Sequence, residues 1–177
     1  KLHDMDLLMT STPPKTPVAL TPLQPNEATA VVMVGEHRGI GLHNLLWILR
    51  TFPNHFKNFI FVSVGIVDVE SFSAKKELTT MQENTNEMLD YFVNYCQQQG
   101  LAAKGFAAYG TDPTEKLTRL SKKIIKEFPH SLFFASKLIF SKDNWITRLL
   151  HNETAVMLQR RLHLLGVQLV ILPMKID

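Results

Sequence analysis

Cysteine is nearly missing from this sequence, since Cys96 is the only one among 177 residues. One cysteine excludes an internal disulfide, and such sparing use is typical of proteins in a reducing compartment. Cys96 falls on the apolar positions of a predicted helix, in line with Leu89 and Phe92. We therefore expect a buried, inert thiol rather than a nucleophile.

Long apolar runs and blocks of one charge are missing as well. A membrane-spanning helix needs about 18 apolar residues, and the best candidate, residues 59–69, is shorter and has the composition of a strand. The net charge is only +3, and the basic residues neither form blocks nor alternate with aromatic residues. These absences argue against a nucleic-acid partner.

Catalytic and metal-binding signatures are also missing. The sequence contains no Gly-x-Ser-x-Gly turn, no P-loop and no pair of carboxylates in a catalytic arrangement. Its seven histidines show no metal-ligand spacing with one another or with carboxylates. His37 and His151 fall near the predicted ligand edge, but surface histidines are the favoured explanation even there. We predict neither an enzyme nor a metal site.

Prolines set the first 28 residues apart from the rest of the chain. They interrupt a run of Thr, Ser and Leu that has no sustained period, which predicts an extended arm or tether with partial polyproline character. Leu7, Leu8 and Met9 are apolar enough to pack on the domain that follows. The five prolines are Pro13, Pro14, Pro17, Pro22 and Pro25.

Apolar runs and helix-period segments alternate from residue 29 to the end. Five short runs have the composition of buried strands, and four segments with apolar residues at helical spacing follow them in turn. This pattern indicates an α/β protein with a parallel sheet covered on both faces. We predict strand order 3-2-1-4-5 with two helices on each face. The expected strands are residues 30–34, 59–67, 101–109, 131–135 and 167–172.

One helix start is predicted in detail. Asp112 is suited to cap the helix that follows it, and Pro113 is suited to the first turn. Glu115 stands where its carboxylate can return a hydrogen bond to the N–H of the cap residue. We therefore expect a helix to begin at this point.

The most specific local pattern is Gly35-Glu36-His37-Arg38-Gly39-Ile40-Gly41, between the first strand and the first helix. Glycines at this spacing let a pyrophosphate approach the N–H groups at a helix start, which makes Gly35, Arg38, Gly39 and Gly41 candidate ligand residues. The spacing resembles the loop of short-chain dehydrogenases, but the Tyr-x-x-x-Lys pair of that family is missing. A tight turn with close helix packing is the favoured explanation. Asp68 is a weaker candidate, for a ribose hydroxyl.

Residues 29–175 resemble the universal stress protein fold. The resemblance rests on the alternation of strands and helices, on Gly110-Thr111-Asp112-Pro113, and on the ending Val170-Ile171-Leu172-Pro173. A closer resemblance is to the cytosolic C-terminal domain of bacterial permeases in the amino acid–polyamine–organocation superfamily. The strings that carry it are Gly39-Ile40-Gly41-Leu42-His43, Phe52-Pro53-Asn54-His55-Phe56-Lys57-Asn58-Phe59, Val62-Ser63-Val64-Gly65, Asn144-Trp145-Ile146-Thr147-Arg148-Leu149-Leu150-His151-Asn152 and Leu158-Gln159-Arg160-Arg161-Leu162.

The resemblance also implies what a nucleotide site would need. Universal stress proteins that bind ATP carry an aspartate at the end of strand one and Gly-x2-Gly-x9-Gly-Ser/Thr after strand four. Here Gly35 takes the place of the aspartate, and Ala135-Ser136-Lys137-Leu138 and His151-Asn152 take the places of the glycines. A nucleotide is therefore a possible ligand, but the ordinary ATP pose is not expected. Ser136, Lys137, Arg148 and Asn152 are the other candidates for holding an anion.

The permease resemblance implies a non-catalytic regulatory or dimerisation domain, residues 29–177, in the cytoplasm of a bacterium. Residues 1–28 would tether it to the inner-membrane domain of the same polypeptide, which would be its first partner. A second copy would join through residues 167–172, an apolar edge strand, unless the arm covers that edge. The alternative is a free-standing nucleotide-binding protein of the universal stress type.

Overall fold

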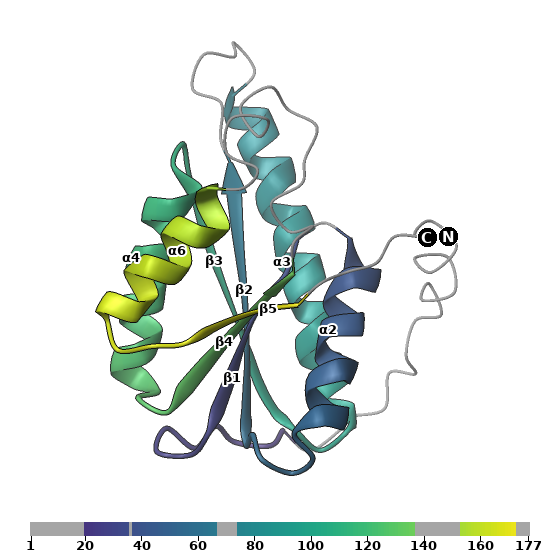
Figure 1. The fold of residues 1–177 in the computed structure, drawn as a ribbon. Coiled ribbons are helices and arrows are strands. Elements are labelled where there is room, and N and C mark those ends of the chain that lie inside the picture. The colour runs from purple at the N-terminus through teal and green to yellow at the C-terminus, as the bar shows by residue number, and fades with distance from the viewer. Residues whose placement is uncertain (1–19, 36, 67–73, 137–152, 173–177) are drawn as a thin grey trace, which may run out of the picture.

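The computed structural model describes residues 20–35, 37–66, 74–136 and 153–172. Strands and helices alternate along these residues, as the sequence predicts (Figure 1). The elements are β1 (Thr29–Met33), α2 (Arg38–Thr51), β2 (Asn58–Ile66), α3 (Ala74–Gln98), β3 (Ala102–Gly110), α4 (Pro113–Glu127), β4 (Ser131–Ser136), α6 (Glu153–Leu164) and β5 (Leu169–Leu172).

The five strands form one sheet in the order β3-β2-β1-β4-β5, and every neighbouring pair is parallel. The predicted fold class and strand order are therefore confirmed. β1 lies at the centre, where Thr29 pairs with Asn58 of β2 on one side and Ser131 of β4 on the other. Every residue of β1 is buried, and its four residues after Thr29 are apolar, as a central strand of a parallel sheet requires.

Two hydrophobic cores lie on opposite faces of the sheet. Side chains of α2 and α3 form one core with Val32 and Phe134, and we call this side of the sheet the α2/α3 face. Side chains of α4 and α6 form the other core with Val31 and Phe133. Alternate residues of β1 and β4 thus enter opposite cores, as the two-residue period of a strand requires. Figure 1 shows the two pairs of helices on either side of the sheet, as predicted.

β5 begins two residues later than expected, at Leu169 instead of residue 167. The end of α6 explains the difference. Gly166 has a positive φ of 75°, and the N–H of Val167 donates to the carbonyl of Leu162 at 3.0 Å. Because this N–H closes the helix, Val167 cannot also pair in the sheet. Gln168 makes the first link to β4, where its carbonyl accepts from the N–H of Phe133 at 3.0 Å.

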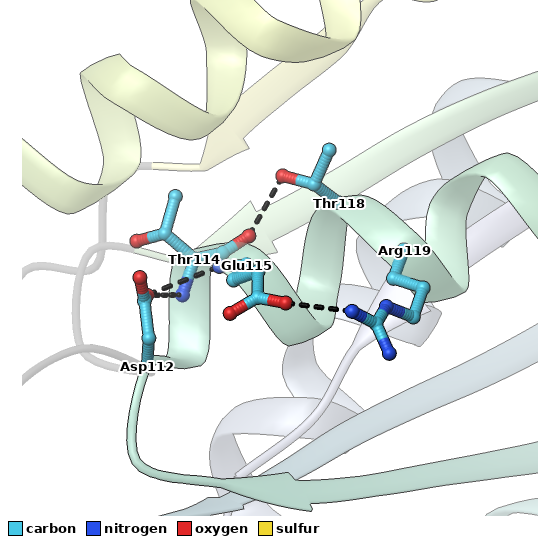
Figure 2. A network of polar contacts seen from close by, with 5 residues as sticks. All are labelled: Asp112, Thr114, Glu115, Thr118 and Arg119. Carbon is cyan, nitrogen blue, oxygen red and sulfur yellow. Dashed lines mark hydrogen bonds and ion pairs between the residues drawn. The ribbon is translucent and has the colours of Figure 1, made fainter.

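The start of α4 is held by the predicted cap. The Asp112 carboxylate accepts hydrogen bonds from the N–H groups of Thr114 and Glu115, at 2.9 and 3.0 Å (Figure 2). The predicted return bond from Glu115 is wrong, because its carboxylate pairs instead with Arg119 at 2.8 Å. That pairing is one helical turn along the same face, where side chains four residues apart meet.

Residues 20–28 are attached to the domain at two points before β1 begins. The N–H of Thr21 donates to the side-chain oxygen of Gln97, near the end of α3, at 2.8 Å. Further along, the carboxamide of Asn58 holds both backbone groups of Gln24. None of the helices in the described part of the chain is both long enough and apolar enough to cross a bilayer.

Candidate functional site

The strand order places a topological switch point between β1 and β4. The helix that leaves β1 covers one face of the sheet, and the helix that follows β4 along the chain covers the other. Chains that diverge in this way leave a crevice at the carboxyl edge, where open α/β sheets bind ligands. Val32 pairs with Phe134, so Ser136, at the end of β4, lies beside Val34. The candidate site is built on these two strand ends.

Ser136 is a buried polar residue without a partner. Its side chain is 0% exposed, and among the described residues no group hydrogen-bonds to its hydroxyl. Phe134, two positions earlier, belongs to the core of the α2/α3 face, so the Ser136 side chain points to that face. A buried hydroxyl without a partner costs about 1–3 kcal/mol and requires an explanation.

Within the described residues, Asn44 of α2 is a second buried polar residue without a hydrogen-bond partner, and both of its side-chain polar atoms are unpartnered. Its side chain is 0% exposed, and neither its carboxamide oxygen nor its nitrogen finds a partner in the described part of the chain. α2 packs on β1 and β4, so Asn44 and Ser136 belong to the same side of the sheet. Together they present a carboxamide and a hydroxyl, groups that both donate and accept hydrogen bonds.

Tyr109 is the third described residue with an unpartnered buried side-chain atom, its hydroxyl. It lies near the end of β3, where its ring packs against Gly65 of β2. Ala107, two positions earlier, joins the core of the α2/α3 face, which places Tyr109 on that face too. All three orphan polar groups of the described residues therefore lie on one side of the sheet.

Sequence reasoning found Ser136 but missed Asn44 and Tyr109. Asn44 carried a readable signal, because it interrupts the apolar helical positions of Leu42, Leu45 and Ile48. A polar residue at a buried helical position normally has a partner. Tyr109 carried no comparable signal, since tyrosine is common in strands.

The glycine loop is explained in part by packing. A Cβ at Gly41 would overlap the ring of Phe92 in α3 and crowd Val34, which follows β1. The guanidinium of Arg38 lies 5.3 Å from the centre of the Tyr91 ring. Burial raises the pKa of Tyr91, and the charge of Arg38 opposes this shift. These contacts agree with the tight turn and close helix packing favoured from the sequence.

The other candidate residues named from the sequence do not all lie at the carboxyl edge of the sheet. Gly35 follows β1 at the carboxyl edge, close to Ser136, whereas Gly39 is buried in the first turn of α2. His37 precedes that helix, and its side chain makes no capping hydrogen bond. Lys137, Arg148 and Asn152 lie outside the described residues, as do Asp68 and His151, so their roles stay predictions.

Cys96 is buried, as expected, with 0% of its surface exposed. Burial raises the pKa of its thiol to about 12, so the residue is a neutral thiol at physiological pH and a poor nucleophile. Within the described ranges, no group of three or more His, Cys, Asp or Glu side chains is arranged to hold a metal ion.

Two surface hollows occur elsewhere. One, of about 400 Å³, lies between α3 and β3 and is lined by Leu89, Asp90 and Lys104 among others. The other, of about 570 Å³, lies on the outer side of α2 and is lined by His43, Leu46, Trp47, Leu49 and Arg50. Neither lies at the carboxyl edge of the sheet.

Comparison with known proteins identifies the fold. No family profile and no curated protein sequence matches the chain. Among solved structures, a universal stress protein family member from Burkholderia pseudomallei aligns with a TM-score of 0.57 at 16% identity, covering 83% of this chain and 96% of that one. A universal stress protein family protein from Arabidopsis thaliana, with AMP bound, aligns with a TM-score of 0.51 at 13% identity, covering 85% and 94%. The fold is therefore of the universal stress protein type.

Proposed function

We propose that this chain is a non-catalytic, ligand-responsive domain that takes a nucleotide of the AMP class at the carboxyl edge of its sheet. The observation that carries the proposal is the pair of orphan polar side chains on the α2/α3 face, Ser136 at the end of β4 and Asn44 of α2, which packs on β1 and β4. A ligand that hydrogen-bonds to them would remove the cost of burying them without partners. The AMP in the Arabidopsis neighbour supports this ligand class.

The sequence at the end of β4 and just after it lacks the glycine motif with which universal stress proteins bind ATP. We therefore expect the nucleotide to bind here in a different pose. Ala135-Ser136-Lys137-Leu138 puts side chains where the glycines of that motif would leave bare backbone for phosphates. Ser136 and Asn44 are neutral groups suited to a base or ribose. We therefore expect AMP or a nucleoside to bind more tightly than ATP.

The decisive experiment compares two serines of the same strand. Ser136→Ala removes the orphan hydroxyl, and Ser131→Ala removes a hydroxyl that donates to the carbonyl of Phe128 at the opposite end of β4. Isothermal calorimetry with AMP should show weaker binding for Ser136→Ala and unchanged binding for Ser131→Ala. Equal affinities in all three proteins, or no binding of AMP, adenosine and cyclic dinucleotides to the parent chain, would refute the proposal.

The permease-type strings support a more specific role, regulation of a membrane transporter for amino acids or related small solutes. In this role the domain is cytoplasmic, attached to the inner-membrane domain of the same polypeptide through the proline-rich arm. Ligand binding would then act on the transporter by changing the contacts of this domain. Membrane helices encoded upstream of Lys1 in the same reading frame would support this role, and a start codon at that point would favour the free-standing protein.

Association through β5 is part of the same proposal. β5 ends the sheet, and its Val170 and Ile171 are half-buried. Because the Gln168 carbonyl faces β4, the backbone groups of Ile171 point away from the sheet and are available to a second copy. Ile171→Lys should reduce a dimer seen by light scattering, whereas Met157→Lys, at an exposed apolar residue of α6, should not. A monomeric parent chain at high micromolar concentration would contradict this association.

A further inference from the structure

The outer side of α2 carries three apolar side chains close together. Leu46 is 46% exposed, and Trp47 and Leu49 are half-buried beside it around a hollow of about 570 Å³. We call this surface the α2 outer face. The opposite side of α2 is already buried against the sheet and α3. Apolar side chains therefore occur on both sides of the helix, with His43, Arg50 and Thr51 exposed beside Leu46.

α4 provides a comparison within the same molecule. The buried apolar residues of α4 lie on the side that faces the sheet. Its outer side carries charged residues in every helical turn. α4 therefore follows the ordinary amphipathic pattern, and the α2 outer face does not. The exposed charged residues of α4 are Glu115, Arg119, Lys122, Lys123, Lys126 and Glu127.

The charged residues of α2 are all basic. α2 contains two arginines and no Asp or Glu. Arg50, at the rim of the hollow, has no carboxylate partner among the described residues. A segment that combines apolar side chains with carboxylates would match this face.

We propose that the α2 outer face is the docking site of the chain's own first nine residues. This segment contains Leu7, Leu8 and Met9, and Asp4 and Asp6 are the only carboxylates before Glu27. The apolar residues would fill the hollow beside Trp47, and the carboxylates would lie near Arg50. The proposal does not depend on the nucleotide site.

The attachment of residues 20–28 makes this docking geometrically feasible. Thr21 is held by Gln97, near the end of α3, and α3 packs beside α2 in the same core. Residues 10–20 lie between this anchor and Leu7–Met9, and eleven residues in a polyproline conformation reach about 34 Å. α2, with 14 residues, is only about 21 Å long. Pro13, Pro14 and Pro17 also reduce the conformational entropy that docking would cost.

A second copy of the chain fits this face less well. In a two-fold contact centred on the α2 outer face, each α2 would meet the other. Because α2 carries arginines and no carboxylate, such a contact would bring like charges together. The acidic N-terminal segment avoids this repulsion.

The test uses Trp47 as a reporter in the full chain. The chain has two tryptophans, so a Trp145→Phe background leaves Trp47 alone. Acrylamide quenching of its fluorescence should be weak in this parent. It should increase, with a red shift of the emission, when Leu7→Asp and Leu8→Asp are introduced together. Leu20→Asp is the matched control, because Leu20 is 79% exposed and lies outside the docking segment. This control should change neither the acrylamide quenching nor the emission wavelength.

Charge reversal tests the electrostatic part. Arg50→Glu should increase quenching of Trp47, and Asp4→Lys with Asp6→Lys should restore protection in that variant. Equal quenching in the parent and in the Leu7→Asp, Leu8→Asp chain would overturn the proposal. Protection that disappears on dilution would overturn it in favour of a second copy. Protection that appears only with phosphatidylglycerol vesicles would overturn it in favour of a membrane surface.

Discussion

Gly41 of α2 and Phe92 of α3 are packed so closely that a Cβ at position 41 would occupy the space of the phenyl ring. The relationship joins the two helices that cover the α2/α3 face. Phe92 is fully buried and stacks on Phe61 of β2 at 5.1 Å between ring centres. Its ring therefore has little freedom to move away.

Gly41→Ala should destabilise the domain for this reason. Overpacking of a core costs about 1–3 kcal/mol, and the better helix propensity of alanine returns about 1 kcal/mol. We expect the free energy of unfolding in urea to fall by the difference. In a Phe92→Leu background, which makes room, the same substitution should become neutral or stabilising. A loss of equal size in both backgrounds would contradict the packing explanation.

Asn58→Ala should remove one of the attachments that hold residues 20–28 to the domain. The Asn58 side chain accepts from the N–H of Gln24 at 2.8 Å, and its nitrogen donates to the Gln24 carbonyl at 2.7 Å and to the Thr29 hydroxyl at 2.9 Å. Loss of these bonds at a fully buried residue should cost about 2–3 kcal/mol in thermal or urea unfolding. Asn94→Ala, at an exposed position of α3, serves as control and should change stability little.

Asp112→Ala should cost more stability than Arg119→Ala, although both residues belong to the network of Figure 2. Asp112 accepts from two N–H groups at the start of α4, and removal of such a cap costs about 1 kcal/mol. The Arg119–Glu115 pair is largely exposed, with 73% and 52% of the side chains accessible, and such pairs contribute about 0.5 kcal/mol or less. Urea unfolding would measure both, and the reverse ranking would contradict this assignment.

Cys96 should make the protein less stable at high pH. Burial raises the pKa of its thiol from 9.0 to about 12. Between these values the unfolded chain loses the proton and the folded chain keeps it. The free energy of unfolding should therefore fall by up to about 1.4 kcal/mol per pH unit in this range. Cys96→Ala should lack this part of the pH dependence.

Reactivity of the thiol provides a second readout. At neutral pH the folded protein should resist a thiol reagent that modifies the urea-unfolded chain readily. Rapid modification under native conditions would show that Cys96 is accessible, against its burial in the structure.

The fold was predictable because its information is local in the sequence. β1, with every residue buried, had to be a continuous apolar run, and Asp112-Pro113 marked a helix start by their own chemistry. Of the predicted site residues, Gly35 and Ser136 lie at the same edge of the sheet because the strand order sets β1 beside β4. Their placement at this edge followed from the predicted topology, and their role as a site stays a prediction.

The rest of the site depended on contacts between distant residues. Close helix packing was expected in the glycine loop, but neither Gly41 as its position nor Phe92 as its partner could be identified, because the crossing of α2 and α3 decides which side chains meet. Asn44 is buried without a partner only because α2 packs on β1 and β4. The burial of Asn44 could be read from its helical position, but whether its side chain finds a hydrogen-bond partner depends on the residues packed around it.

The central position of β1 has a consequence for synthesis of the protein. Its pairing with β2 joins Thr29 to Asn58, but its pairing with β4 joins Thr29 to Ser131, which a growing chain supplies much later. Chains are translated at about 5–20 residues per second, so one edge of this fully buried strand waits for several seconds without its neighbour. A sheet of β1, β2 and β3 formed in that interval would expose an edge that is a target for chaperones and for misfolding.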